Sequence, residues 1–369
     1  MYSIRMDEFT LPLQALKGRG VAHHQPHRFE RDQRAAFDDG WGTLQDAQSD
    51  GEEAAAPATQ VTWEDCKSAI TRNHSPDIGL NLGLNPYRGC EHGCVYCYAR
   101  PTHSYLNLSP GLDFETKLVA KRNIASVLRQ ELLRPAFVPG MVAVGTVTDA
   151  YQPIEREWRL TRAVLEVLGT AQLPLAMVTK GSGVERDLDL LAPLGQQRLA
   201  AVYVTITTLD PKLARILEPR AAAPHRRLRT IRTLAEVGVP TGVSVSPQIP
   251  FINDDMEQVL EAAYEAGARR AFYQVLRLPW ELSPMFRQWL ELHYPDRAAR
   301  VMGRVQDLRG GKDYDADFAT RMKGQGIWAD LIRQRFVKTC DRLGFNRDRE
   351  PLDTNRFRPA ALRGQGDLF

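Results

Sequence analysis

The sequence predicts an α/β fold in which parallel strands alternate with helices. Between about residues 82 and 276, six short apolar runs suit strands, and longer segments with helical spacing separate them. This alternation is typical of parallel strands that are joined by right-handed crossovers. A doubly wound sheet and a barrel both match the pattern, and periodicity alone does not separate them.

The expected elements are short, and several are bounded by proline or glycine. The strands are expected at residues 82–87, 142–148, 175–179, 201–206, 243–246 and 271–276. The helices are expected near residues 116–133, 154–168, 184–192, 225–237 and 254–267. Pro153 suits the start of a helix, and Gly238 suits the position just after one. Asp254 and Glu257 have the spacing of a capping box.

We expect three parts along the chain. Residues 1–60 are polar, small and aperiodic, which predicts a disordered N-terminal arm. Residues 76–310 form the core, and residues 311–369 form a helical C-terminal extension with a helix near 327–343. The arm carries a basic patch between residues 17 and 34. This patch is either a solvated tail or a contact for phosphate or nucleic acid, and we favour the tail.

Composition and charge are those of an ordinary globular protein. Of the 369 residues, 43% are hydrophobic and 25% are charged, and the net charge is +3. This balance does not by itself predict nucleic-acid binding. No apolar run approaches the length of a membrane helix, and the first residues do not resemble a signal peptide. We therefore expect a cytoplasmic protein with reduced thiols.

Three of the five cysteines fall within eight residues. Cys90, Cys94 and Cys97 have the spacing C-x3-C-x2-C, and the other two cysteines are far away in the sequence. Three thiolates can hold three corners of a cubane iron–sulfur cluster and leave the fourth iron open. The alternative is a structural Cys3His zinc site completed by His92 or His103, although the second C-x2-C pair of many zinc sites is missing. The odd number of cysteines argues against a disulfide framework.

The motif resembles the signature of the radical S-adenosylmethionine (radical SAM) superfamily. Tyr96 before the third cysteine and Tyr98 after it resemble the branch related to spore photoproduct lyase, over about residues 60–350. The resemblance implies a partial (β/α)6 TIM-like barrel, a 4Fe–4S cluster and S-adenosylmethionine bound at the open iron. It also implies a flavodoxin- or ferredoxin-type electron donor. The electron splits the sulfonium and yields a 5′-deoxyadenosyl radical that abstracts hydrogen from a substrate.

Active groups in such barrels follow the carboxyl ends of the strands, which gives further candidates. The resemblance implies that Tyr96 and Ile249 contact adenine and that Lys180 pairs with the methionyl carboxylate. Many relatives have Gly-Gly-Glu after the second strand to hold the amino group of the cofactor. This chain lacks that motif, and Thr148 or Asp149 is expected to serve there on its position alone. The hydroxyl of Thr205 can reach the ribose or the carboxylate, although threonine also simply suits strands. Tyr273, Gln274 and Arg277, at the end of the sixth strand, are expected to face substrate.

The substrate is open to three hypotheses. A DNA-lesion lyase would agree with Tyr98, the candidate catalytic residue, but its hydrogen-donor cysteine has no counterpart between Cys97 and Cys340. The second hypothesis is radical modification of RNA, protein or a small molecule, and the third is a non-catalytic zinc or nucleic-acid binding module. A basic stretch at residues 215–232 would suit a nucleic-acid or other phosphate-bearing substrate. It would equally suit the solvated face of a helix, which we favour.

Overall fold

A curved, mostly parallel sheet organises the computed structural model, which describes residues 15–22, 24–30, 58–347 and 350–363. Within these residues the main sheet has seven strands in the order β10-β9-β8-β7-β6-β3-β2. The strands are β2 (Ile70–Arg72), β3 (Leu82–Leu84), β6 (Val142–Val144), β7 (Leu175–Thr179), β8 (Ala200–Thr205), β9 (Thr241–Ser244) and β10 (Arg270–Phe272). Neighbours from β3 to β10 are parallel, and β2 is antiparallel to β3. The parallel strands follow chain order without a reversal, as in a barrel and unlike a doubly wound sheet, so the predicted fold class is confirmed.

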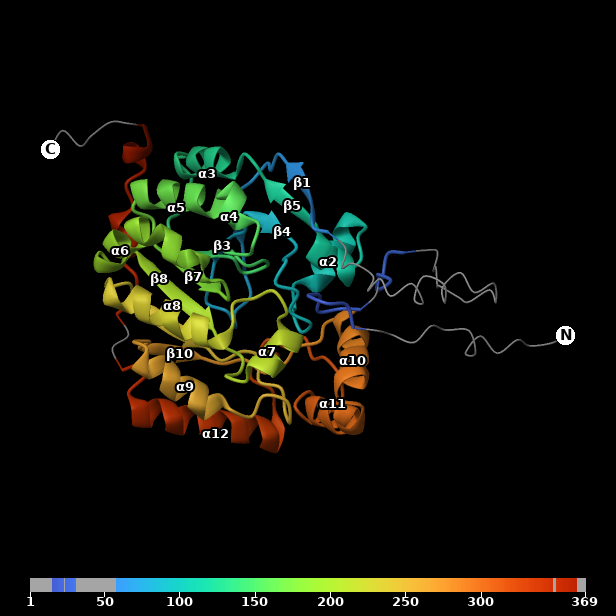
Figure 1. Ribbon diagram of the computed structural model, residues 1–369. Helices are drawn as coiled ribbons and strands as arrows, with labels where there is room; N and C mark the ends of the chain where they lie inside the picture. Colours follow the sequence, from blue (N-terminus) through green and yellow to red (C-terminus); the bar gives the residue numbers. More distant parts are fainter. Residues whose placement is uncertain (1–14, 23, 31–57, 348–349, 364–369) are drawn as a thin grey trace.

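Helices cover the outside of this sheet. Figure 1 shows α3, α5, α6, α8 and α9 following one another along one side, with α12 beyond α9. The helices are α2 (Leu112–Thr116), α3 (Ile124–Leu132), α4 (Glu155–Trp158), α5 (Leu160–Thr170), α6 (Leu188–Gln196), α7 (Pro211–Leu217), α8 (Pro224–Glu236), α9 (Met256–Glu265), α10 (Leu282–His293), α11 (Ala298–Asp307) and α12 (Gly326–Leu343). Short 3-10 helices are η2 (Arg100–Leu106), η3 (Ser182–Asp187), η4 (Pro295–Arg297), η5 (Thr354–Arg356) and η6 (Pro359–Arg363).

The core lies between the sheet and these helices. Five of the six residues of β8 are buried, as expected for a central parallel strand that is covered on both faces. Ile231 and Leu234 of α8 are also buried and face the sheet at helical spacing. The helix ends before Gly238, whose φ of +81° a residue with a side chain rarely adopts.

The first predicted strand and helix are divided differently in the structure. A second sheet, in the order β1-β5-β4, contains β1 (Gln60–Glu64), β4 (Tyr87–Arg88) and β5 (Lys117–Lys121). The helix expected near 116–133 is therefore wrong over its first third, where β5 pairs in parallel with β1. Leu118 and Ala120 are buried at alternate positions of β5, a period-2 pattern that a helical window hides.

The expected capping box does not form. Asp255 is the N-cap residue of α9 and makes no side-chain capping bond. The carboxylate of Glu257 instead accepts hydrogen bonds of 2.7 and 2.6 Å from the guanidinium of Arg335 on α12. The Glu257 side chain, which the local pattern assigned to the cap, therefore forms a long-range ion pair instead.

The C-terminal part is helical, as predicted, and it contacts two regions. α12 packs against α9, whereas α10 and α11 pack against the cysteine loop and α7. Within the described residues, no helix combines the length and the apolar character that crossing a membrane requires.

Part of the predicted N-terminal arm is packed on the core. Of residues 1–60, the ranges 1–14 and 31–57 and residue 23 lie outside the described residues, so the expected disorder is not addressed there. In the described part, Val21 is buried and the Gly20 amide donates to Glu115 Oε2 at 3.0 Å. Arg28 forms an ion pair of 2.9 Å with Glu281. The expectation of a solvated tail is therefore wrong for Gly20, Val21 and Arg28.

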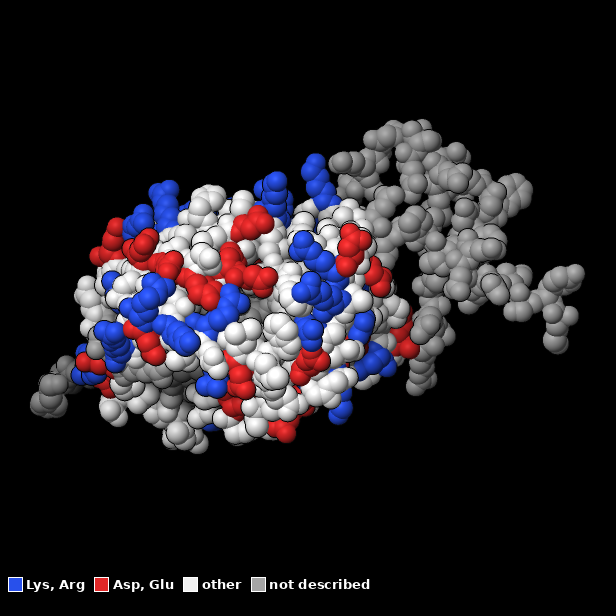
Figure 2. All heavy atoms as spheres, turned by 90° about the horizontal axis from the view of Figure 1, so that it is seen from below, with Lys and Arg blue, Asp and Glu red and all other residues white. Residues whose placement is uncertain are grey.

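Charges of both signs are mixed over the surface. Figure 2 shows Lys and Arg interspersed with Asp and Glu on the face seen from below. In the basic stretch at 215–232, Arg226 pairs with Glu185 and Arg220 with Glu91. Arg227 is buried, which corrects the expectation that the arginines of this stretch lie on a solvated face.

Candidate active site

The sequence-predicted site residues meet at the carboxyl edge of the parallel sheet. The cysteine loop follows β3, Thr148 and Asp149 follow β6, and Lys180 follows β7. Thr205 ends β8, and Ile249 lies in the loop after β9. Parallel strands place their carboxyl ends at one edge, so residues that are far apart in the sequence come to surround the cysteine loop.

The three cysteines are free thiols in a largely buried loop. Cys90 and Cys94 are buried, and Cys97 is partly buried. Burial raises the pKa of Cys90, and the thiols of Cys94 and Cys97 are close enough to raise it further. Burial also raises the pKa of Cys94 to about 12, although Lys180 opposes the shift. Without a bound cation the thiols of Cys90 and Cys94 therefore stay protonated, and a positively charged centre would be needed to hold them as thiolates.

The loop is fixed by hydrogen bonds from outside it. The amide of Cys90 donates to Phe114 O at 2.9 Å, and the amide of Val95 donates to Leu217 O at 3.1 Å. Gly93 has a φ of +66°, and a Cβ there would lie 2.7 Å from Glu115 Oε2. Only glycine fits this turn without strain.

Arg100, which we did not single out from the sequence, clamps the same loop. Its buried guanidinium donates to Cys94 O at 2.8 Å, to Gly93 O at 3.0 Å and to Gly111 O at 2.9 Å, and it forms an ion pair with Glu115. Arg100 is three residues after Cys97, which is the only sequence signal that it serves the loop.

Asp149 is occupied by protein groups. Its carboxylate accepts hydrogen bonds of 2.7 Å from Thr179 Oγ1 and from the amide of Lys180. His92 Nδ1 lies 3.3 Å from Asp149 Oδ2. Burial opposes ionisation of Asp149, but His92 and these donors lower its pKa well below the ordinary value. Asp149 therefore fixes the start of the Lys180 loop.

The two histidines near the cysteines have other partners. His92 faces Asp149, and His103 Nε2 lies 3.0 Å from Lys117 O. Among the described residues, no group of three or more His, Cys, Asp and Glu side chains converges on one metal-ion position. A cubane cluster differs from a single ion because each cysteine binds a different iron.

A buried polar cluster surrounds Tyr96. The Tyr96 hydroxyl donates to Glu218 and lies 3.2 Å from Thr207 Oγ1, which itself donates to Glu218 at 2.5 Å. Arg227 forms an ion pair with Glu218 and donates to Thr205 O at 2.9 Å. Sequence reasoning missed Glu218 and Arg227. Arg227 lies four residues before Ile231 and seven before Leu234, so its position in the apolar stripe of α8 was the available signal.

Lys180 lies beside this cluster. Its Nζ is 5.6 Å from the centre of the Tyr96 ring. Burial works against its charged form, but Cys94 and the carboxylates of Glu218 and Asp149 raise its pKa above the ordinary value. A cationic amine thus faces the cysteine loop.

Thr148 and Ile249 support the loops around them. The Thr148 hydroxyl donates to Gly89 O at 2.6 Å and accepts from Gln152 Nε2 at 3.1 Å. The amide of Ile249 donates to Asn253 Oδ1 at 2.7 Å, and its buried side chain packs in the same apolar cluster as Cys94 and Tyr96. Asn253 and Gln152 are further residues that sequence reasoning missed.

Tyr98 contacts the segments that follow two distant strands of the parallel sheet, β6 and β10. Its hydroxyl donates to Thr146 O after β6, and the Arg277 guanidinium after β10 lies 5.4 Å from its ring centre. These strands are near opposite ends of the sheet order, so the contact shows that the sheet curls. The Tyr98 side chain is 45% exposed and is open to a reactant.

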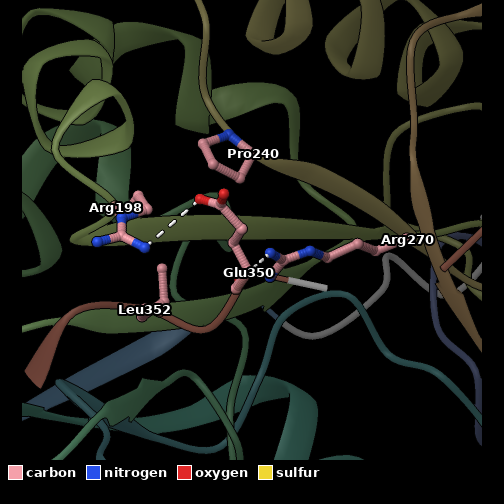
Figure 3. Close-up of a pocket in the computed structure, with 5 residues that line it drawn as sticks. All are labelled: Arg198, Pro240, Arg270, Glu350 and Leu352. Carbon is pink, nitrogen blue, oxygen red and sulfur yellow. Dashed lines mark hydrogen bonds and ion pairs between the residues drawn. The ribbon is translucent and has the colours of Figure 1, made fainter. Parts of the chain in front are cut away.

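A pocket at the opposite edge of the sheet is not part of this site. It has a volume of about 220 Å³ and is lined by Arg198, Pro240, Arg270, Glu350 and Leu352 (Figure 3). Three of these residues stand at the amino ends of β8, β9 and β10. That end of a (β/α) barrel generally serves stability, and Glu350 lies 3.4 Å from Arg198 there.

Comparison with known proteins identifies the family. Residues 84–263 match the family model described as "Radical SAM superfamily". An uncharacterized protein of Mycobacterium tuberculosis is 37% identical over 239 residues, which cover 64% of this chain and 70% of that protein. An uncharacterized protein of Methanocaldococcus jannaschii is 29% identical over 218 residues, which cover 59% of this chain and 78% of that protein.

Solved structures share the fold. A spore photoproduct lyase mutant with bound AdoMet and dinucleoside spore photoproduct has a TM-score of 0.50 at 14% identity, over 77% of this chain and 80% of that one. A second spore photoproduct lyase mutant also has a TM-score of 0.50 at 14% identity, over 82% of this chain and 92% of that one. At such identity the likeness concerns the fold alone. The family match and the mycobacterial relative lead to one conclusion: the chain belongs to the radical SAM superfamily.

Proposed function

We propose that this protein is an enzyme that reductively cleaves S-adenosylmethionine at a 4Fe–4S cluster held by Cys90, Cys94 and Cys97. The observation that carries the proposal is a set of three free thiols on the loop after β3, at the carboxyl edge of a parallel sheet. When bound, the cluster and S-adenosylmethionine supply the electron transfer and C–S cleavage that yield a 5′-deoxyadenosyl radical. In this proposal residues 76–310 are the catalytic core and residues 311–369 its helical extension.

The chemistry of the donor set fits the cluster. Thiolates are the usual ligands of iron–sulfur clusters, and three of them leave one iron for an outside ligand. The two nearby histidines contact Asp149 and Lys117, which supports a cluster over Cys3His zinc. Free thiols also fit a reducing compartment such as the cytoplasm, where a flavodoxin- or ferredoxin-type protein would supply the electron.

The residues around the loop receive distinct roles. We assign Lys180 to the methionyl carboxylate because it is a partly buried cation that faces the loop. Tyr96 and Ile249 would flank the adenine from the apolar cluster that contains Cys94. Thr148, Asp149 and Thr205 would support the loops around the site. The Thr148 hydroxyl donates to Gly89 O, Asp149 accepts the Lys180 amide, and Thr205 O accepts from Arg227.

Tyr98 is the candidate catalytic residue. It follows the third cysteine directly, and its ring is exposed beside the strand ends. Its hydroxyl is held by Thr146 O, so the phenol has a fixed position from which to meet a substrate. In this proposal the radical then modifies RNA, protein or a small molecule.

A DNA-lesion lyase of the photoproduct type is the weaker alternative. Such an enzyme needs a hydrogen-donating cysteine near the end of the second parallel strand. Here β6 ends at Val144, and Gly145 to Asp149 follow without a cysteine. Cys66 and Cys340 are both buried in the main hydrophobic core, so neither replaces it.

Metal analysis of the full-length protein tests the proposal. Anaerobically reconstituted protein should contain about four iron and four sulfide per chain. Alanine in place of Cys90, Cys94 or Cys97 should lower both contents, whereas Cys66→Ala and Cys340→Ala, the matched controls, should not. A colourless protein with one zinc, or equal iron in all five variants, would contradict the proposal and favour a zinc-binding module.

A further inference from the structure

Arg277 stands where a substrate would meet the loop after the cysteines. It lies five residues after the end of β10. Its guanidinium carbon is 5.4 Å from the ring centre of Tyr98, the residue next to Cys97. An arginine stacked on an aromatic ring still presents its N–H donors sideways to another group.

These donors are poorly satisfied within the described residues. Arg277 Nε is buried and has no hydrogen-bond partner. The described contact of Nη1 is with Met322 Sδ at 3.5 Å, and sulfur is a weak acceptor. A buried polar group that lacks a partner costs free energy, so a partner of another kind is expected here.

Asp77, an acid near enough to Arg277 to sense its charge, is already engaged by another arginine. Arg321 takes both carboxylate oxygens of Asp77, with Nε–Oδ2 at 2.5 Å and Nη2–Oδ1 at 2.7 Å. Among the described side chains, no carboxylate lies within ion-pair distance of Arg277. The charge of Arg277 is therefore not balanced by a direct partner.

A second arginine adds to this positive charge. The buried Arg309 donates to Leu276 O at 2.6 Å and to Arg321 O at 2.8 Å, which are neutral acceptors. Burial and the charge of Arg277 lower the pKa of Arg309 to about 10, and Asp315 offsets part of this shift. Two cations thus repel each other beyond the end of β10. A site lined by charges of one sign attracts ions of the opposite sign, here an anion.

We infer that Arg277 holds an oxyanion of the substrate, a phosphate or a carboxylate, beside Tyr98. This inference rests on the proposed function, because it assigns the reactant that Tyr98 would face. Guanidinium binds either group through two parallel N–H donors. Oxyanion binding would satisfy Nε, balance the Arg277–Arg309 repulsion and place the substrate next to the cysteine loop.

Anion binding to the cluster-loaded, full-length protein tests the inference. The probes are inorganic phosphate and acetate, and the readout is the rise in Tm with probe concentration, which gives Kd by linkage. We expect Arg277→Gln to weaken binding of the preferred anion about tenfold or more. Arg277→Lys keeps the positive charge but lacks the paired N–H donors of guanidinium. Its Kd for the anion should therefore lie between the Kd of the wild type and that of Arg277→Gln. The control is Arg297→Gln, since Arg297 also lies over an aromatic ring, 5.8 Å from the ring centre of Tyr294, but is itself exposed and should not affect binding.

The relative binding of the two probes distinguishes a phosphate-bearing substrate from a carboxylate substrate. Stronger binding of phosphate indicates a phosphate-bearing substrate, and stronger binding of acetate indicates a carboxylate. Equal binding by wild type and Arg277→Gln overturns the inference, provided that iron content and circular dichroism show a folded variant. It is also overturned if Arg277→Gln weakens S-adenosylmethionine binding, because the arginine would then serve the cofactor. The assay needs no turnover, so failure to release 5′-deoxyadenosine would count against the proposed function alone.

Discussion

Arg100 and Glu115 form a fully buried ion pair in which the arginine also binds the carbonyls of Gly93 and Cys94. The carboxylate of Glu115 in turn accepts the Gly20 amide of the N-terminal segment. One charged pair therefore connects the cysteine loop to two other parts of the chain. The loop can keep its shape through protein contacts before any cluster binds.

Removing Arg100 should destabilise the protein strongly. Arg100→Ala removes the ion-pair partner of the buried Glu115, which typically costs about 3–5 kcal/mol. Urea unfolding of the metal-free protein measures this loss. Arg333 is the control, since it pairs with Asp330 at the surface, where the side chains are 58% and 59% exposed. Arg333→Ala should cost less than about 1 kcal/mol, and an equal cost for both variants would contradict the role of Arg100.

Lys180 should matter for the cofactor and not for the cluster. Lys180→Met removes the partly buried cation that we assign to the methionyl carboxylate. We expect the Kd for S-adenosylmethionine to rise about tenfold or more, with unchanged iron content. Equilibrium binding to the reconstituted protein is the measurement, and Lys338→Met on the exposed face of α12 is the control. Unchanged affinity in Lys180→Met would remove Lys180 from the site.

Glu218 should make stability depend on pH in the acid range. Burial favours its neutral form, but Arg227 and Lys180 lower its pKa to about 2, below the ordinary 4.5. Its ionised form therefore stabilises the folded chain above about pH 4.5, and this contribution is lost as the pH falls towards 2. The shift corresponds to on the order of 3 kcal/mol.

The pH dependence is measured as a difference between two proteins. The unfolding free energy of wild type minus that of Glu218→Gln should be constant between about pH 5 and 7 and should shrink below about pH 4.5. Glu261→Gln, which affects a surface pair with Arg342, should differ from wild type by less than about 1 kcal/mol throughout. A difference for Glu218→Gln that stays constant in acid would show that its pKa is not lowered.

Gly20 should be needed to seat the N-terminal segment. A Cβ at Gly20 would lie 1.7 Å from Gly93 O, a backbone atom of the cysteine loop. We expect Gly20→Ala to release this segment, so that trypsin cuts after Arg19 faster than in wild type. The control is Gly303→Ala in α11, where a Cβ meets nothing within 4 Å. That variant should be more stable by about 0.5–1 kcal/mol, and equal cleavage of all three proteins would contradict the contact.

The sequence predicted what depends on local pattern. Strands such as β7 and β8 are apolar runs bounded by polar loops, so the strand ends and the residues after them, such as Lys180, could be placed. The cysteine loop was found because its chemistry lies within eight residues. β5 was missed because its two-residue period is only five residues long and adjoins helical segments.

The polar partners could not be predicted because they come from distant parts of the chain. Tyr96 and Glu218 are 122 residues apart, and neither shows a local sign of the other. The curvature that brings Arg277 to Tyr98 depends on the whole sheet. For Asp149 the position was predicted, but its contacts with Thr179 and the Lys180 amide follow from the packed loop.

The release of 5′-deoxyadenosine tests the central claim most directly. Anaerobically reconstituted protein is mixed with S-adenosylmethionine and dithionite, and the nucleoside is measured by chromatography. We predict release by the wild type and by Cys340→Ala, and none above background by Cys90→Ala, Cys94→Ala or Cys97→Ala. Release that persists when any one of these three thiols is removed, or no release by iron-loaded wild type, would contradict the claim that they hold the reactive centre.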